Sequence, residues 1–395
     1  MKEKSQQSLI KLFLREARLI AKDHSVLLTV LIAPLLYAFF YGSIYINKEE
    51  FEVKLAVVDD DQSQLSRLLQ QNIDNSPIVD LIHFSNLKEA QEAMYSGNCQ
   101  GYFYIPEGIE KNLLSLKQSN VVLAVNAARF IPSSDLLMSV QQICLTIGAG
   151  VRLQYFQKSE GMSTAASMDN VMPVNLDYRP LFNERSSYGA FLLPGLLALI
   201  LQQTLLIGLS ESVAGERQHF RLKDWLSDGI SNGIWGKGLF YLLLFSSYGF
   251  FFLNVNYKLL NLPMRGNGFE LGILLLLFII TLIPMAQFIG SFFKSQLICL
   301  QVMAFSTYPI FLITGYSWPF ESLPVVLRWL SNLLPTTPFI AMYTGIVQSG
   351  ASLRETPSTL LHLMMLLVFY STVCHLRLLY LSTTDFRRKK RFSFL

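Results

Sequence analysis

The residues that come nearest to a nucleotide-binding motif lie in the glycine-rich run GISNGIWGKG, which contains a Gly236-Lys237 pair. A phosphate-binding loop has the pattern GxxxxGK[ST], so it needs a glycine at position 231, where this chain has Ser231. The nucleophile of many serine hydrolases lies in GxSxG, but Ser210 lies in GLSES. The sequence therefore predicts neither ATP binding through a phosphate-binding loop nor a serine hydrolase site.

The histidines and cysteines are too dispersed to predict a metal site. No HExxH or CxxC motif occurs among the five histidines and four cysteines. His362 and His375 share the last apolar run, where a proton relay and interfacial packing are both open interpretations. Cys99 and Cys144 fall in a more polar segment and could form a disulfide if that segment is exported. We expect no catalytic centre and no metal centre.

The composition is that of a membrane protein. Hydrophobic residues make up 51% of the chain and charged residues 15%, against about 25% charged in soluble domains. The charges gather in short clusters and leave long uncharged windows, which indicates a polytopic α-helical membrane protein. No basic stretch is interleaved with aromatic residues over a polar domain, so we expect no nucleic-acid partner.

The charge-free run Tyr188–Ser210 is the clearest membrane span. It is long enough to cross a hydrocarbon core of about 30 Å at about 1.5 Å per residue. Five further apolar runs bring the predicted total to six transmembrane helices; they are Val26–Ile46, Gly238–Tyr257, Leu271–Phe293, Ser295–Phe320 and Thr356–Leu376. The first span belongs to residues 25–47, and the other five lie within residues 186–381.

An apolar segment between the last two spans, residues 321–348, is interrupted by Pro324, Pro335 and Pro338. We expect two short re-entrant or interfacial helices there, because broken backbone at membrane depth must be shielded by protein or line a cavity. A seventh complete span is the alternative.

Residues 48–185 differ in character and predict an α/β domain inserted between the first and second spans. Four predicted strands alternate with helices, which favours a largely parallel sheet; they are Val53–Asp59, Val79–Phe84, Gly101–Ile105 and Val121–Asn126. A long helix follows, with apolar residues at helical spacing from Leu136 to Val151, and then a Gly/Ser/Met-rich linker over Ser159–Asn170.

The N-terminal residues 1–24 contain an amphipathic helix, Leu9–Lys22, with a basic face and an apolar face. We expect it to lie in the membrane interface against anionic lipid headgroups, a solvated charged helix being the alternative.

The distribution of lysine and arginine predicts the orientation. Six precede the first span, four lie in residues 211–237, and five form the run Arg387–Arg391 in the basic tail, residues 382–395. The loops on the opposite side carry fewer, so both termini are expected in the cytoplasm and the α/β domain outside.

Several ordered stretches resemble the ABC-2 type permease subunits of ABC exporters that carry a large extracytoplasmic domain after the first span. These stretches are LIAPLLYAFFYGS, LAVVDDDQSQLSRLL, YSGNCQGYFYIPEGIEKNLL, LFNERSSYGAFLLPGLLALIL and ITGYSWPFESLPVVLRWLSNLLPTTPF. The resemblance implies a bacterial inner-membrane location, a partner ATPase that holds ATP and Mg in the cytoplasm, and a second permease, either a copy or a paralogue. It also implies export of an apolar or amphipathic substrate by a chain that is not itself an enzyme. A periplasmic adaptor is a further partner that the sequence leaves open.

Two sets of residues are candidates for function. Residues 211–237 correspond to a cytoplasmic loop that couples to the ATPase, and the candidate contacts there are Glu216, Arg217, Phe220, Arg221, Lys223 and Trp225. Aromatic residues at the outer ends of the spans could form a substrate path or exit gate, or an interfacial aromatic belt; the candidates are Phe311, Tyr316, Trp318, Phe320 and Pro324. The rival hypothesis is a membrane-anchored receptor or assembly platform whose external domain binds a partner without transport.

Overall fold

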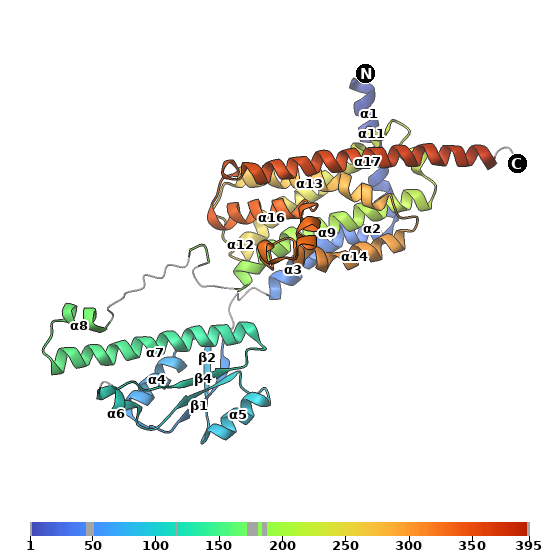
Figure 1. Ribbon diagram of the computed structural model, residues 1–395. Helices are drawn as coiled ribbons and strands as arrows, with labels where there is room; N and C mark the ends of the chain where they lie inside the picture. Colours follow the sequence, from blue (N-terminus) through green and yellow to red (C-terminus); the bar gives the residue numbers. More distant parts are fainter. Residues whose placement is uncertain (1, 45–50, 116, 172–180, 184–187, 393–395) are drawn as a thin grey trace. The chain divides into compact units, whose positions relative to one another are not determined.

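The computed structural model describes residues 2–44, 51–115, 117–171, 181–183 and 188–392. It divides into two compact units (Figure 1). The helical unit comprises Met1–Ile46 and Pro180–Leu395, and the sheet unit comprises Asn47–Arg179. The predicted domain limits at residues 48 and 185 lie outside the described residues, as does Glu184 in the approach to the second span.

The sheet unit contains a four-stranded sheet in the order β2-β1-β3-β4. Its strands are β1 (Val53–Asp59), β2 (Val79–His83), β3 (Gly101–Ile105) and β4 (Val122–Val125). All four predicted strands are present, and β1 and β3 have the predicted bounds. The two pairings of β1 are parallel, whereas β4 pairs antiparallel with β3 at the edge, so the sheet is parallel in three of its four strands.

Helices cover both faces of this sheet. The helices of the unit are α4 (Gln64–Asp74), α5 (Leu87–Tyr95), α6 (Ile109–Leu114), α7 (Phe130–Ser159) and α8 (Thr164–Val171). Alternation along β1 directs Leu55 and Val57 into a core with α4, α6 and α7, and directs Ala56 and Val58 toward α5. Cys99 packs on the α5 face and Cys144 against the opposite face, so the two thiols are free and cannot pair.

Residues Ser159–Asn170 were predicted to form a linker, but helix α8 begins at Thr164, so the prediction is wrong for the second half of this segment. Its sequence, TAASMDNV, contains alanine and methionine, which favour helix. The small and polar residues in and before this segment are typical of a linker, so the sequence did not predict the helix.

The helical unit is built almost entirely from helices, and most of its long helices run roughly side by side, while α1 runs across them (Figure 1). Its longer elements are α1 (Lys2–Lys22), α3 (Ala33–Ile44), α9 (Tyr188–Gln218), α11 (Ile230–Phe251), α13 (Gly268–Gly290), α14 (Gln296–Ile313) and α17 (Pro357–Phe392). Its shorter elements are α2 (His24–Leu27), η1 (Leu28–Ile32), α10 (Leu222–Trp225), η2 (Phe252–Asn256), α12 (Tyr257–Leu259), η3 (Phe320–Ser322), α15 (Val325–Asn332), α16 (Thr336–Thr344), η4 (Gly345–Ser349) and η5 (Leu353–Glu355).

Seven helices of the described residues are long and apolar enough to cross a membrane. Six of them correspond to the predicted spans, and the seventh, Phe130–Lys158, is helix α7 of the sheet unit. The segment between the last two predicted spans contains two short helices, α15 and α16, as expected. Whether they enter the membrane stays a prediction.

Helix α9 is the central element of the helical unit. It is the most deeply buried of the seven helices, and it packs against α3, α11, α13, α14 and α16. Glycines allow this close approach, because a side chain at Gly208 would overlap Val30 and one at Gly290 of α13 would overlap the backbone of Ser210.

Two predicted boundaries are wrong. Residues 211–237 do not form a loop, since α9 continues to Gln218 and α11 begins at Ile230. The span predicted over Ser295–Phe320 ends at Ile313, because Gly315 adopts a positive φ of 85° soon afterwards. Tyr316, Trp318 and Phe320 therefore follow the helix instead of lying within it.

Candidate functional site

Helix α1 carries one acidic residue in the middle of its buried stripe. Leu12, Glu16 and Ile20 are spaced four residues apart, lie on one face, and are all buried. Helix α1 packs with this face against α11. A buried carboxylate requires a compensating charge, so the side chains facing Glu16 decide what this contact can do.

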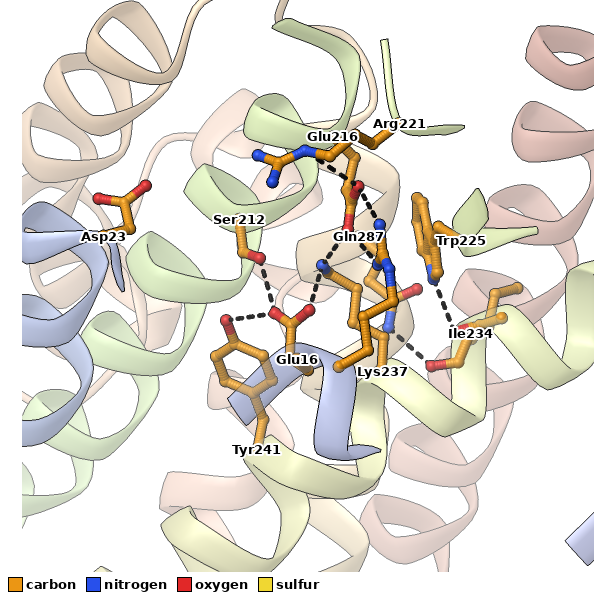
Figure 2. A network of polar contacts seen from close by, with 12 residues as sticks. Glu16, Asp23, Ser212, Glu216, Arg221, Trp225, Ile234, Lys237, Tyr241 and Gln287 are labelled. Atoms are coloured by element: carbon orange, nitrogen blue, oxygen red, sulfur yellow. Dashed lines mark hydrogen bonds and ion pairs between the residues drawn. The ribbon is translucent and has the colours of Figure 1, made fainter. Parts of the chain in front are cut away.

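Lys237 of α11 supplies that charge. Its Nζ donates to Glu16 Oε2 at 2.6 Å and to Glu216 Oε1 at 3.2 Å (Figure 2). All three side chains are 1% exposed. One ammonium group thus bridges two carboxylates from α1 and α9 at a buried site, where ion pairs interact more strongly than at the surface.

Arg15 provides the second positive charge. Its Nη1 and Nη2 donate to the two carboxylate oxygens of Glu216 at 2.6 and 2.8 Å, a bidentate arrangement. Burial lowers the pKa of Arg15, but the hydrogen bond and charge of Glu216 outweigh this, so its pKa lies above the usual value. With two carboxylates and two cations, this group of side chains is electrically balanced.

Two hydroxyl groups complete the coordination of Glu16. Ser212 of α9 donates to Glu16 Oε1 at 2.6 Å, and Tyr241 of α11 donates to the same oxygen at 3.2 Å (Figure 2). We call Arg15, Glu16, Ser212, Glu216, Lys237 and Tyr241 the charge cluster. It joins α1, α9 and α11 by ion pairs and hydrogen bonds that are directional, unlike the apolar contacts around them.

The residues next to the charge cluster are also fixed by specific bonds. Trp225 Nε1 donates to the carbonyl of Gly233 at 2.9 Å, and Lys237 Nζ lies 5.3 Å from the Trp225 ring centroid. Arg217 Nη1 donates to the carbonyls of Ser291 and Phe293 at the end of α13. The region from α9 to α11 is therefore tied to α13 as well.

The predicted coupling residues separate into buried and exposed groups. Glu216 and Trp225 are buried, which corrects the prediction that they lie on an accessible loop. Arg221 is half-buried, and its Nε lies 4.0 Å from Glu216 Oε2. Phe220 is 83% exposed and Lys223 is exposed, so these two remain accessible to a partner.

Two of the predicted exit residues line one open cavity. It has a volume of about 440 Å³, and Tyr316 and Phe320 lie on its wall with Phe191, Glu321 and His362. The Tyr316 ring stacks on Phe191 with centroids 5.2 Å apart, and its hydroxyl donates to the Phe191 carbonyl. We call this the aromatic cavity.

The other predicted exit residues do not line the aromatic cavity. Phe311 is buried in the core of the helical unit, Trp318 is exposed, and Pro324 is exposed and directly precedes α15. Phe311 still contacts Tyr316 from behind the cavity wall, with ring centroids 6.3 Å apart, whereas Trp318 and Pro324 are not among the residues that line the cavity.

A second cavity of about 600 Å³ lies beside the charge cluster. Its walls come from the junction of α1 and α2, the last turns of α9, and the start of α14. Asp23, Ser25, Glu216, Arg221 and Gln296 are among its lining residues. We call this the charged cavity. In the described part of the chain, no group of three metal-ligating side chains occurs in it or elsewhere.

Sequence reasoning missed Arg15, Glu16 and Lys237 as members of one site. The sequence signal for Glu16 was an acidic residue at the centre of an otherwise apolar stripe. For Lys237 it was a single lysine at the beginning of a long apolar helix. Glu16 and Lys237 are 221 positions apart in the sequence, and no local pattern predicts that they are in contact.

A family model described as ABC-2 family transporter protein matches residues 24–373. The chain belongs to this family. It is an ABC-2 transporter permease, a transmembrane transport protein, and the resemblance seen in the sequence is confirmed.

Curated relatives agree with the assignment. The probable multidrug ABC transporter permease YbhS of Escherichia coli is 22% identical over 349 residues, which is 86% of this chain and 88% of the relative. The inner membrane transport permease YhhJ of Escherichia coli is 25% identical over 336 residues, covering 82% and 84%. ABC transporter G family member 20 of Dictyostelium discoideum is 22% identical over 358 residues, covering 85% of this chain and 45% of the relative.

Proposed function

We propose that this ABC-2 permease is the membrane-spanning subunit of an ATP-driven exporter. A separate cytoplasmic ATPase would hold ATP and Mg, and this chain would move an apolar or amphipathic substrate outward. The observation that carries the proposal is the charge cluster, which joins α1 to α9 and α11 directly beside the exposed turn after α9. The name of YbhS, which refers to multidrug transport, supports an apolar or amphipathic substrate.

The proposed arrangement uses six of the seven apolar helices as spans. Helix α7 is assigned to the sheet unit, because Leu136 and Val140 pack into the core that β1 forms with α4 and α6. Both termini then lie in the cytoplasm and the sheet unit lies outside the inner membrane, in keeping with the distribution of basic residues.

The proposed docking surface for the ATPase is the turn between α9 and α11. Phe220 has a positive φ of 56° and projects an almost fully exposed ring, and Lys223 adds an exposed charge nearby. An exposed aromatic side chain surrounded by polar groups is a typical anchor in a protein interface. The turn is held in place by the Arg221–Glu216 ion pair and by the hydrogen bond from Trp225 to Gly233. Arg217 connects the end of α9 to the end of α13 by hydrogen bonds.

Force from the ATPase would pass through the charge cluster. Helices α1, α9 and α11 share buried ion pairs, so displacing one of them without the others would separate charges in a low-dielectric site, at a cost of about 3–5 kcal/mol. The three helices therefore move together. Helix α9 continues to Phe191 and the aromatic cavity, so its displacement would change the shape of the proposed exit.

A second permease, identical or paralogous, completes the proposed transporter. An ATPase dimer presents two docking sites, so two copies of the turn after α9 are required to occupy both.

Co-purification with the ATPase partner tests the docking surface. Phe220→Asp should abolish recovery of the ATPase with the permease, whereas Phe269→Asp should not. Phe269 is a matched control, because it is also exposed but lies in the first turn of α13, at the end of the helical unit that the proposal assigns to the outside. Unchanged recovery with Phe220→Asp would contradict the docking surface and favour a membrane-anchored receptor or assembly platform.

A further inference from the structure

Glu211 of α9 is a buried acid that the charge cluster does not include. Its side chain is 1% exposed, as are those of Glu16 and Glu216. It lies within a helix that is long and apolar enough to span a membrane. Ionisable residues in such positions are costly and are commonly functional.

Glu211 differs from the other two buried glutamates in having no cation. The ion pairs formed by Glu16 and Glu216 with Lys237 and Arg15 have no counterpart at Glu211 among the described residues. Its Oε2 is fully buried and has no hydrogen-bond partner, while the side chain interacts with the hydroxyl of Ser25.

Among the titratable groups that face Glu211 is a second acid. These groups are Asp23 at the junction of α1 and α2, Tyr241 of α11 and Cys299 of α14. None of these carries a positive charge. A carboxylate buried in apolar surroundings without a cation is expected to bind a proton and become neutral.

A route for that proton begins in the charged cavity. Asp23 and Ser25 both line the charged cavity. Asp23 Oδ1 accepts from the backbone N–H of Ser25 at 3.2 Å, and its Oδ2 accepts from Gln296 Nε2 at 2.7 Å. Ser25 therefore contacts Asp23 through its backbone and Glu211 through its hydroxyl.

We propose that Glu211, near the C-terminal end of α9, is a proton-binding site. Its carboxyl group holds a proton while α2, α9 and α14 are packed together as in this structure. When these helices separate, water from the charged cavity reaches the carboxyl group. The O–H bond breaks, the proton passes to water, and the carboxylate remains until the helices close and it takes a proton back. The link to the transport cycle rests on the proposed function, whereas proton binding itself does not.

Infrared spectroscopy of the purified full-length permease, without the ATPase, tests proton binding directly. At pH 7 the wild-type protein should show the C=O stretch of a neutral carboxylic acid, and Glu211→Gln should lose that band. Glu321→Gln should retain it, because Glu321 is exposed to solvent. Identical wild-type and Glu211→Gln spectra in this region would overturn the proposal.

A stability measurement provides the second test. Glutamine resembles a neutral carboxyl group, so Glu211→Gln should melt within about 2 °C of the wild type, while Glu216→Gln should melt clearly lower. A loss of melting temperature in Glu211→Gln as large as that in Glu216→Gln would show that Glu211 acts as a carboxylate and would also overturn the proposal. Because the ATPase is absent from both experiments, neither outcome depends on whether the chain couples to one.

Discussion

Lys237 and Glu16 form an ion pair 2.6 Å long in which both side chains are 1% exposed. The pair joins α1, which precedes the first span, to α11, which lies on the far side of the sheet unit in the sequence. Buried pairs of this kind add little stability compared with well-packed apolar residues, but they strongly penalise any structure in which the partners separate. We conclude that the pair fixes the position in which α1 packs against α11.

Removing the cation alone should be severely destabilising. Lys237→Met leaves Glu16 without its cation and Glu216 with Arg15 and the more distant Arg221, so we expect a loss of about 3–5 kcal/mol in the free energy of unfolding. The double variant Lys237→Met with Glu16→Gln removes one charge of each sign and should recover much of that loss. Thermal unfolding in detergent measures both.

Lys258→Met provides the matched control for this pair of variants. Lys258 is exposed on α12, so the same substitution should change stability by less than about 0.5 kcal/mol. A Lys237→Met protein as stable as Lys258→Met, or a double variant whose loss equals the sum of the single losses, would contradict the coupled cluster.

The aromatic cavity depends on a glycine of α9. A side chain at Gly195 would overlap the ring of Tyr316, and that ring cannot easily yield because it stacks on Phe191 and donates to the Phe191 carbonyl. Gly195→Ala should therefore destabilise the helical unit by about 1–3 kcal/mol.

Gly272→Ala in α13 tests whether the effect is steric. A Cβ at Gly272 meets no atom within 4 Å, so alanine there should be neutral or stabilise by about 0.5–1 kcal/mol through its helix preference. Equal melting temperatures for the two alanine variants would show that the approach of Tyr316 to α9 is not tight.

The stability of the sheet unit should depend on pH through Asp61. This carboxylate accepts from the backbone N–H groups of Gly108, Ile109 and Glu110 at 2.7, 3.0 and 3.3 Å. Burial raises the pKa of Asp61, but a hydrogen bond with Ser63 and the three N–H bonds outweigh it, so its pKa lies below the usual value.

The direction of this pH dependence follows from the lowered pKa. Asp61 contributes its stabilisation above its unfolded pKa, and the contribution is lost as the pH falls through the folded pKa. At pH 7, Asp61→Asn should lose about 1 kcal/mol, comparable to losing a helix cap. The difference should shrink at acid pH.

Hydrogen exchange of the β3 and α6 amides, corrected for the intrinsic rate at each pH, measures the effect of Asp61→Asn. Asp74→Asn is the control, because Asp74 is exposed at the end of α4 and should not protect those amides. Faster exchange in Asp74→Asn than in Asp61→Asn would refute the assignment.

Local pattern was sufficient to predict the strands and most of the long apolar helices. The strand β1 has the predicted bounds because a short run of apolar residues that ends at a polar residue can be recognised as a strand without knowing which strands pair with it. The antiparallel pairing of β4 was not predictable in this way, since strand direction depends on how the chain returns to the sheet edge.

The candidate site was less predictable because it is assembled from distant segments. Trp225 lies in a polar sequence, RLKDWLSD, that suggests a surface loop, yet it is fully buried against Gly233 and Lys237. Burial of this kind is decided by tertiary packing. The local signals that could have indicated the site are the acid within an apolar helical stripe at Glu16 and the single lysine in an apolar helix at Lys237.

Hydrolysis of ATP by the partner ATPase in proteoliposomes tests the central claim most directly. We predict that the wild-type permease and Phe269→Asp both increase the ATPase rate several-fold over the ATPase alone, and that Phe220→Asp does not. A rate that is the same with and without the permease would contradict the account of this chain as the membrane subunit of an ATP-driven exporter.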